Sequence, residues 1–308
     1  MVSQAPAFGL RPFRAERVLA YVALTKPRII ELLLVATLPT MIVAQRGLPP
    51  LGLVVATLVG GALAAGGANA MNMYVDRDID RVMNRTKRRP LVTGAVSPLG
   101  AFVFACGLEV VAFVELWWAV NPLSAFLSLA AAVFYVGVYT LWLKRRNSQN
   151  IVIGGAAGAV PALVGWTAVT GSLGWAPVVL FAIVFLWTPP HFWALAVRYR
   201  EDYAAAKVPM LPVVASPQRI TRSILLYTVA LVAVSIDFVF VAHMGVTYLV
   251  VASVAGALYV AMSARFWYHA HLGAAIDKEA MALFGYSITY LTVLFFSMAL
   301  DVFVRRLH

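Results

Sequence analysis

Residues 51–72 read LGLVVATLVGGALAAGGANAMN, a run without any charged side chain. A helix that crosses a bilayer needs ~20 mostly apolar residues, so this run predicts a membrane span. Eight further runs of this kind occur along the chain. The predicted spans are 29–46, 51–72, 98–118, 123–143, 151–170, 175–195, 222–242, 246–265 and 282–303. The runs are continuous rather than alternating, so they predict helices and not the strands of a barrel.

The composition of the chain agrees with this interpretation. Hydrophobic residues make up 62% and charged residues 12% of the 308 residues, whereas a soluble domain carries roughly 45–50% and about 25%. So few charges cannot cover a soluble surface, which excludes a soluble enzyme, a disordered chain and a collagen-like chain. The single cysteine, Cys106, excludes an intramolecular disulfide and a cysteine-based metal site.

The charges are unevenly distributed along the chain. If the N-terminus is cytoplasmic, 21 of the 24 lysines and arginines fall in cytoplasmic segments. Cytoplasmic loops are rich in these residues, so we expect a multi-pass protein of the bacterial inner membrane with its N-terminus inside. We expect a cytoplasmic N-terminal arm (1–28), one transmembrane domain (29–303) and a short tail (304–308). Positive charge spread over many loops does not form a nucleic-acid-binding domain.

The second span runs into a row of oxygen-bearing side chains. Residues 69–94 read NAMNMYVDRDIDRVMNRTKRRPLVTG, in which Asn72, Asp76 and Asp80 are spaced by four. Each step of four rotates an α-helix by only about 40°, so these three side chains share one face while Asp78 points elsewhere. Two carboxylates and an amide suit Mg²⁺, which prefers oxygen ligands and usually bridges to substrate phosphates.

A simpler interpretation of this segment stays open. Basic residues follow the acids, and an amphipathic loop whose aspartates and arginines pair in water would show the same pattern. However, an ionisable row that enters a membrane span is costly unless it lines a wet cavity. That cost favours a functional site, in which the acids hold a metal ion and the basic residues bind a diphosphate.

A second polar cluster follows the sixth span on the same side of the membrane. It contains His191 at the end of the span, Asp202 as a counterpart to the acidic row, and the cations Arg198 and Lys207. A lone histidine near a helix end is mostly a hydrogen-bonded structural residue. The chain shows no arrangement of residues typical of a nucleophilic enzyme.

These residues resemble the UbiA superfamily of intramembrane aromatic prenyltransferases, and within it the branch that farnesylates haem. The acidic row is typical of the whole superfamily, whereas the strings after the sixth span are typical of the branch. The matching strings are TKPR (25–28), the segment 72–94, QNIVIGGAAGAVPALVG (149–165), WTPPHFWAL (187–195), DYAAAKVPMLP (202–212) and FGYSITYL (284–291). They cover most of the chain.

The resemblance implies an all-α fold with nine transmembrane helices around a central cavity, capped by the two long cytoplasmic loops. It also implies farnesyl diphosphate and haem b as substrates, Mg²⁺ as cofactor, and haem O and diphosphate as products. The chain departs from many superfamily members at one position, because Arg198 stands four residues before Asp202 where they carry a second aspartate. This departure argues against two metal ions held symmetrically and is compatible with a direct cationic contact to the diphosphate.

Three groups of residues are assigned roles on this basis. The predicted metal ligands are Asn72, Asp76, Asp80 and Asp202, which form the catalytic group with Lys207. The predicted diphosphate ligands are Arg85, Arg88, Lys144, Arg145 and Arg198. The residues predicted to contact haem or the prenyl chain are His191, Trp187, Trp193 and Tyr199. The resemblance makes His191 a candidate ligand of the haem iron, and the rings of the other three would stabilise an allylic cation.

Two other functions stay open. The first is a UbiA-type prenyltransferase that acts on an aromatic quinone precursor, with the same metal chemistry and a different acceptor pocket. The second is an ion-coupled secondary transporter, because polar helix ends and glycine-rich spans also occur in transporters. Transporter sites lie near the bilayer midplane, however, whereas these acids cluster toward one face. The bilayer is an expected partner, and an enzyme that takes over the haem product is a further one.

Overall fold

The structure is a computed structural model that describes residues 14–307, apart from the side chains at 14, 29, 32 and 33. Residues 1–13 of the expected N-terminal arm, and the last residue of the tail, lie outside the described residues. All elements of the described part are helices. They are α1 (Arg14–Thr25), α2 (Pro27–Gln45), α3 (Leu51–Val75), α4 (Arg77–Val82), α5 (Pro90–Thr93), α6 (Pro98–Ala119), α7 (Pro122–Val133), η1 (Phe134–Leu143), α8 (Asn150–Thr170), α9 (Trp175–Arg198), α10 (Arg200–Ala205), α11 (Leu211–Val214), α12 (Pro217–Val241), α13 (Val246–His271) and α14 (Asp277–Val304).

Within the described residues, eight helices are long and apolar enough to cross a membrane, with α7 and η1 counted as one. The first predicted span, 29–46, falls on α2, whose described apolar part is the shorter stretch Leu34–Gln45. α2 as a whole runs over 19 residues, so the number of nine spans stays a prediction, of which the described residues show eight. The chain is a multi-pass, all-α membrane protein.

Several helices extend beyond the predicted spans. α12 begins at Pro217 rather than at 222, because the Ser216 side chain accepts a hydrogen bond from the Arg219 backbone N–H and caps the helix. α13 continues to His271, beyond the predicted end at 265. Hydropathy detects the apolar middle of a membrane helix, whereas caps and polar turns decide where the helix begins and ends.

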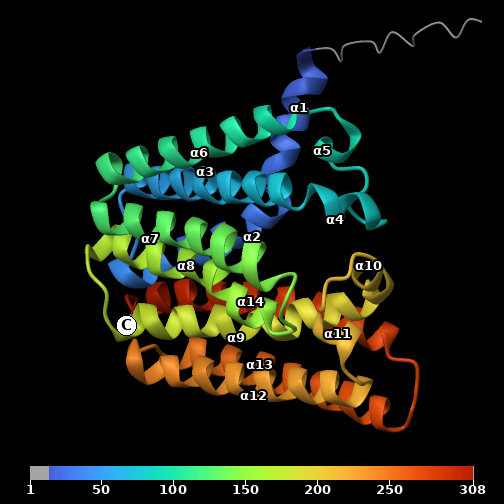
Figure 1. Cartoon of the computed structure of the whole chain (residues 1–308). Helices are drawn as coiled ribbons and strands as arrows, with labels where there is room; N and C mark the ends of the chain where they lie inside the picture. The colour runs from blue at the N-terminus through green and yellow to red at the C-terminus, as the bar shows by residue number, and fades with distance from the viewer. Residues whose placement is uncertain (1–13, 308) are drawn as a thin grey trace, which may run out of the picture.

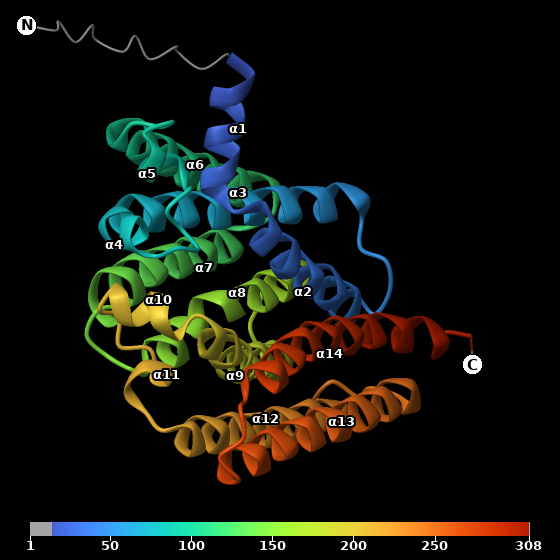
Figure 2. The ribbon, with the colours of Figure 1, turned by 90° about the vertical axis from the view of Figure 1, so that its right-hand side faces the viewer.

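The long helices pack in chain order into a closed ring. α2 packs on α3, α3 on α6, and the series continues through α7, α8, α9, α12 and α13 to α14, which packs back on α2. α2 also contacts α8, and α9 contacts α14, so helices from the two halves of the ring touch across it. Both ribbon views show α12 and α13 side by side at the edge opposite α3 and α6 (Figures 1 and 2).

Glycines allow the closest helix contacts in this ring. A Cβ added at Gly165 of α8 would lie 2.7 Å from the backbone oxygen of Thr37 in α2. A Cβ added at Gly67 of α3 would lie 3.0 Å from the backbone oxygen of Ala105 in α6. Backbone atoms cannot turn away as side chains can, so these positions require glycine for helix packing, as is common in membrane proteins.

The helix that begins as α7 changes its winding halfway along its length. α7 continues directly into the π-helix η1, and the Lys144 backbone N–H donates to the Tyr139 oxygen five residues earlier. π-helical turns are rare and often occur at functional sites. The altered winding carries Thr140 and Lys144 to the end of α3, where both side chains contact the polar row described below.

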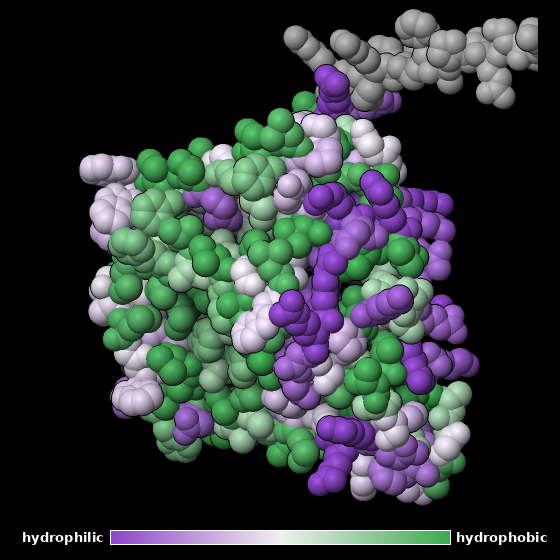
Figure 3. Space-filling view, in the orientation of Figure 1, coloured by the Kyte–Doolittle hydropathy of each residue, from purple (hydrophilic) through white to green (hydrophobic). Residues whose placement is uncertain are grey.

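Polar residues gather at one side of the molecule. Figure 3 shows hydrophilic side chains concentrated where α1, α4, α5 and α10 lie, while hydrophobic side chains cover most of the rest of this face. This distribution agrees with a protein whose long loops emerge on one side of a bilayer. The short helices α4, α5, α10 and α11 all belong to the two long polar loops predicted from the sequence.

The glycine contact at α8 generates a stability prediction. Gly165→Ala should lower the free energy of unfolding by about 1–3 kcal/mol, because the added methyl meets backbone in a packed interface. Gly158→Ala is the matched control on the same helix, since a Cβ there meets nothing within 4 Å. The control should be neutral or stabilised by up to about 1 kcal/mol. Thermal unfolding of both variants in detergent measures the difference, and equal midpoints would contradict the packing argument.

Candidate functional site

The acidic row lies at the end of α3, as the spacing predicts. α3 ends at Val75, and the backbone continues through Asp76 into α4 with the hydrogen bonds Asp76 N to Asn72 O and Asp80 N to Asp76 O, both 2.9 Å. The side chains of Asp76 and Asp80 are buried, whereas that of Asp78 is 59% exposed. The prediction that Asp78 points to a different face is confirmed.

Asn72 and Asp76 contact each other directly. The Asn72 amide donates to Asp76 Oδ2 at 2.8 Å and to Thr140 Oγ1 of η1 at 3.1 Å. Its own oxygen accepts a hydrogen bond of 2.8 Å from Lys26 Nζ. Burial lowers the pKa of Lys26 well below its usual range, with repulsion from other cations as a further cause. The row is thus linked to both the first helices and η1.

Each carboxylate of the row has a cationic partner. Lys144 Nζ bonds to Asp76 Oδ2, and Arg89 Nη1 lies 2.7 Å from Asp80 Oδ2. Arg145 lies 2.6 Å from Asp78 Oδ2 and 3.8 Å from Asp76 Oδ1. The simpler interpretation, in which acids and bases pair, is therefore realised, but two of the acids pair in a buried setting rather than in water.

Two of these cations are absent from the residues predicted as site residues. Lys26 lies in the string TKPR, and its backbone adopts a left-handed conformation (φ 54°) at the start of α2. Arg89 lies in the basic stretch after the acids, at the turn before α5. Both residues lie in segments that resemble the family, TKPR (25–28) and 72–94. Spacing alone gave no reason to predict Arg89 rather than Arg85 or Arg88 as the partner of the acidic row.

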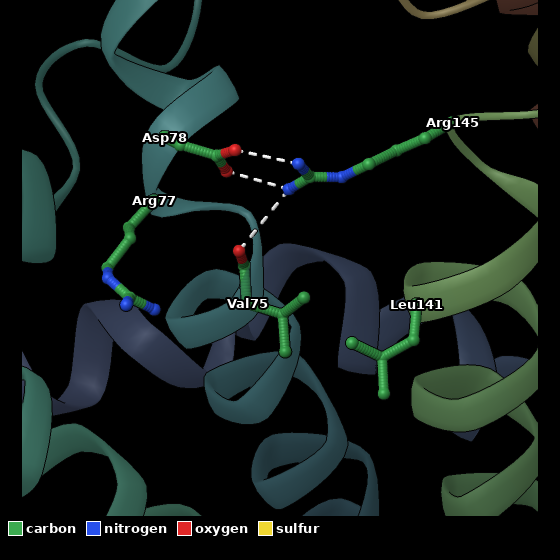
Figure 4. A pocket seen from close by; sticks show the side chains of 5 residues that line it. All are labelled: Val75, Arg77, Asp78, Leu141 and Arg145. Atoms are coloured by element: carbon green, nitrogen blue, oxygen red, sulfur yellow. Dashed lines mark hydrogen bonds and ion pairs between the residues drawn. The ribbon is translucent and has the colours of Figure 1, made fainter.

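A hollow opens beside Asp78, outside the row. It has a volume of about 400 Å³ and is lined by Val75, Arg77, Asp78, Leu141 and Arg145. Figure 4 shows the Arg145 guanidinium reaching across from the end of η1 to both carboxylate oxygens of Asp78. The hydrogen bonds from Arg145 hold the pKa of Asp78 below its usual range. Figure 4 shows that this pair lies beside the end of α3.

Asp202 joins the two long polar loops. It accepts hydrogen bonds of 3.1 Å from the Asn84 amide and from the Arg85 backbone N–H. The Arg85 guanidinium lies over the ring of Tyr199, 5.5 Å from its centroid. Desolvation acts to raise the pKa of Asp202, but these hydrogen bonds outweigh it and leave the pKa below its usual range. Arg88, Arg198 and Lys207 lie exposed on the same two loops.

The four predicted metal ligands do not all come together. Among the described residues, no three Asp, Glu, His or Cys side chains are close enough to hold a metal ion. The structure therefore does not bring Asp202 to Asp76 and Asp80. Asp76 and Asn72 fit a hard cation, because Asp76 Oδ1 is buried without any hydrogen-bond partner and Asn72 bonds to the same carboxylate, whereas both oxygens of Asp80 accept from Arg89. A buried carboxylate oxygen without a donor is a ready ligand for Mg²⁺.

The aromatic residues predicted to contact substrate divide into two groups. Trp187 and His191 lie on one face of α9, with stacked rings 4.2 Å apart, and face α14. Trp193 is buried on another face, edge-on to Tyr227 of α12 at 5.5 Å. Tyr199 lies in the loop under Arg85. The structure thus places Trp193 in the packing between α9 and α12 and away from His191.

The loop contact through Asp202 generates a second prediction. Asp202→Ala should loosen the segment around Asn84 and Arg85, which hydrogen exchange detects as faster amide exchange there. The control is Glu201→Ala, an exposed acid on the same turn, which should leave exchange unchanged.

The same contact has a predictable pH dependence. The folded-state pKa of Asp202 is lowered, so the contact is present above the ordinary aspartate pKa of about 3.9 and is lost as the pH falls through the lowered value. Amides of this segment that exchange equally fast in wild type and in Asp202→Ala at neutral pH would contradict this role.

Comparisons with known proteins agree with this geometry. Residues 33–301 match the model of the UbiA prenyltransferase family. The chain is 54% identical to a protoheme IX farnesyltransferase of Paenarthrobacter aurescens, over 92% of this chain and 89% of that protein. The fold resembles a solved structure of digeranylgeranylglyceryl phosphate synthase with a TM-score of 0.76 at 16% identity, covering 93% of this chain and 99% of that one. A solved structure of a UbiA homologue from Archaeoglobus fulgidus bound to GPP and Mg²⁺ matches with a TM-score of 0.61 at 18% identity. This match covers 91% of this chain and 99% of that chain. The chain belongs to the UbiA prenyltransferase family.

Proposed function

We propose that this protein transfers the farnesyl group of farnesyl diphosphate to a vinyl group of haem b, giving haem O and diphosphate with the help of Mg²⁺. The observation that carries the proposal is the buried pair Asp76 and Asp80, surrounded by cations at the end of a membrane helix. The name of a relative with 54% identity supports haem as the acceptor. The GPP and Mg²⁺ bound by a UbiA homologue support the diphosphate and the metal.

The residues of the row have separate tasks in this reaction. Asn72, Asp76 and Asp80 would hold Mg²⁺, which would neutralise the diphosphate and make it a better leaving group. Lys144 and Arg89 lie on the carboxylates of Asp76 and Asp80. From there these two cations would reach the diphosphate oxygens and stabilise the charge that develops on the leaving group.

The proposed reaction needs no covalent bond between the enzyme and a substrate. The bond between the first farnesyl carbon and the diphosphate oxygen breaks, and the diphosphate leaves with the electron pair. The π electrons of the haem vinyl group form the new carbon–carbon bond. Water then adds to the resulting cation and releases a proton to solvent. Aromatic side chains such as Trp187 stabilise the allylic cation by cation–π attraction.

The loops that carry Asp202, Arg198, Lys207, Arg85 and Arg88 cover the diphosphate end of the site in this proposal. Asp202 closes them over the acidic row, and the exposed cations add to the positive field that attracts the diphosphate. We place these loops on the cytoplasmic side of a bacterial inner membrane, with the N-terminus inside, because lysine and arginine concentrate there. Haem and the farnesyl chain enter from the bilayer, and a partner enzyme takes over haem O.

A product assay tests the proposed function directly. Purified protein in lipid nanodiscs, given farnesyl diphosphate, Mg²⁺ and haem b, should yield haem O, identified by mass spectrometry. With 4-hydroxybenzoate in place of haem b, no prenylated product should form. A farnesylated benzoate with no haem O would show that the acceptor is a quinone precursor instead.

The acidic row generates a further prediction. Asp76→Ala and Asp80→Ala should each reduce farnesylation by about 10²-fold or more, because each removes a charge that holds the metal. Both should also weaken Mg²⁺-dependent binding of a thiodiphosphate analogue of farnesyl diphosphate, which does not require turnover. The control is Asp277→Asn, an exposed acid in the first turn of α14. Wild-type turnover in either alanine variant would contradict the role of the row.

A further inference from the structure

The proton of the His191 ring is located by its contact with Ser287. His191 Nδ1 lies 2.7 Å from Ser287 Oγ, and this hydroxyl donates its proton to the backbone oxygen of Phe284 at 2.6 Å. A hydroxyl has one proton to donate and a carbonyl oxygen has none. With the hydroxyl proton on Phe284 O, Ser287 Oγ accepts from Nδ1, and this is the tautomer that we assign. The neutral ring carries its proton on Nδ1 and keeps the lone pair on Nε2.

Neighbouring rings hold the imidazole in this orientation. His191 stacks between Trp187 at 4.2 Å and Phe284 at 4.6 Å, with interplanar angles of 21° and 29°. The Trp187 indole N–H donates to the backbone oxygen of Ser287 at 2.7 Å. The Ser287 side chain thus contacts His191, and the Ser287 backbone oxygen contacts Trp187, one of the two rings that stack on the histidine.

The second ring nitrogen is left available. No group among the described residues hydrogen-bonds Nε2. Nε2 is also not one of the completely buried polar atoms without a partner, so it keeps some accessible surface. His191 also contacts Phe192 edge-on at 5.0 Å, and Phe192 packs against the cluster that contains Ile79 of α4. Phe192 therefore connects the His191 ring to the hydrophobic cluster around Ile79, which lies next to Asp80 in the sequence.

We propose that Ser287 is a positioning residue that keeps His191 in this tautomer, so that Nε2 ligates the iron of the substrate haem. This inference rests on the proposed function, because it takes haem b as the acceptor. Histidine ligates iron through the lone pair of the neutral ring, and an Nδ1–H donated to a fixed acceptor orients the ring and makes it a stronger ligand. An anchored iron limits how the macrocycle can slide in an apolar site, which helps to present one vinyl group to the farnesyl carbon.

Haem binding by the purified protein tests the proposal without turnover. Ferrous haem b is added to the protein in nanodiscs, and the Soret band, the iron–histidine stretch in resonance Raman spectra and the binding affinity are recorded. The wild type should show a five-coordinate histidine complex. His191→Ala should lose the iron–histidine band and regain an equivalent band when imidazole is added. Ser287→Ala should bind haem about 10- to 100-fold more weakly with a shifted or broadened band, whereas Ser287→Thr should retain the wild-type band.

Ser297→Ala is the matched control. Ser297 is also buried on α14 and donates to the backbone oxygen three residues earlier, but it has no histidine partner among the described residues. It should leave the haem spectrum unchanged. An unchanged spectrum and affinity in Ser287→Ala would overturn the positioning role, and an unchanged band in His191→Ala would overturn iron ligation.

The outcomes also separate this inference from the proposed function. If the wild type forms haem O while the spectra of these variants stay unchanged, the inference alone fails. If the wild type neither binds haem b nor forms haem O, the proposed function itself fails. Unfolding midpoints of Ser287→Ala and Ser287→Thr, with Mg²⁺-dependent diphosphate binding, show whether the variants are folded. A Ser287→Ala protein that binds the diphosphate normally but has an altered haem spectrum supports the proposal.

Discussion

Asp76 and Asp80 put two carboxylates into the end of a membrane helix, where their side chains are almost completely buried. An uncompensated buried charge costs several kcal/mol. The fold meets this cost by bringing cations from three separate segments to one place. Lys144 arrives at the end of the π-helix η1, Arg89 from the turn after α4, and Lys26 from the junction of α1 and α2.

The same constraint relates the ring of helices to the chemistry. A cation can reach Asp76 only if η1 lies against α3, and the glycines of α3 and α8 allow the neighbouring helices to approach closely. Buried pairs of this kind seldom add stability over apolar packing. In the proposed function they keep carboxylates and cations together in an apolar surrounding, where the carboxylates would hold a metal ion and the cations would bind a diphosphate.

Part of this site could be predicted from the sequence. The spacing of Asn72, Asp76 and Asp80 predicted their common face and the different direction of Asp78, because both follow from helix geometry. The cation partners could not be derived in the same way. Lys26 meets Asn72 across 46 residues and Lys144 meets Asp76 across 68, so only tertiary packing selects them from 24 basic residues. The contact of Asp202 with the other loop rather than with the acidic row is a loop conformation that hydropathy does not contain.

Other differences have local causes. Trp187 and Trp193 belong to one string, but six residues along an α-helix turn the side chain by about 240°, so the two face different neighbours. The π-helix shifts the register after Phe134 and could not be read from a continuous apolar run. The membrane spans and the spacing of the acidic residues are local properties of the sequence. The ion pair of Lys144 with Asp76 depends on tertiary packing instead.

In the proposed function, Lys144 and Arg89 would exchange their carboxylate partners for the diphosphate when Mg²⁺ is bound. An experimental structure with Mg²⁺ and a non-reacting thiodiphosphate analogue of farnesyl diphosphate tests it most directly. We predict Mg²⁺ on the oxygens of Asp76 and Asp80, with Lys144 and Arg89 moved from these acids onto the diphosphate. A bound diphosphate with both ion pairs still intact would contradict the account, as would a diphosphate held elsewhere in the molecule.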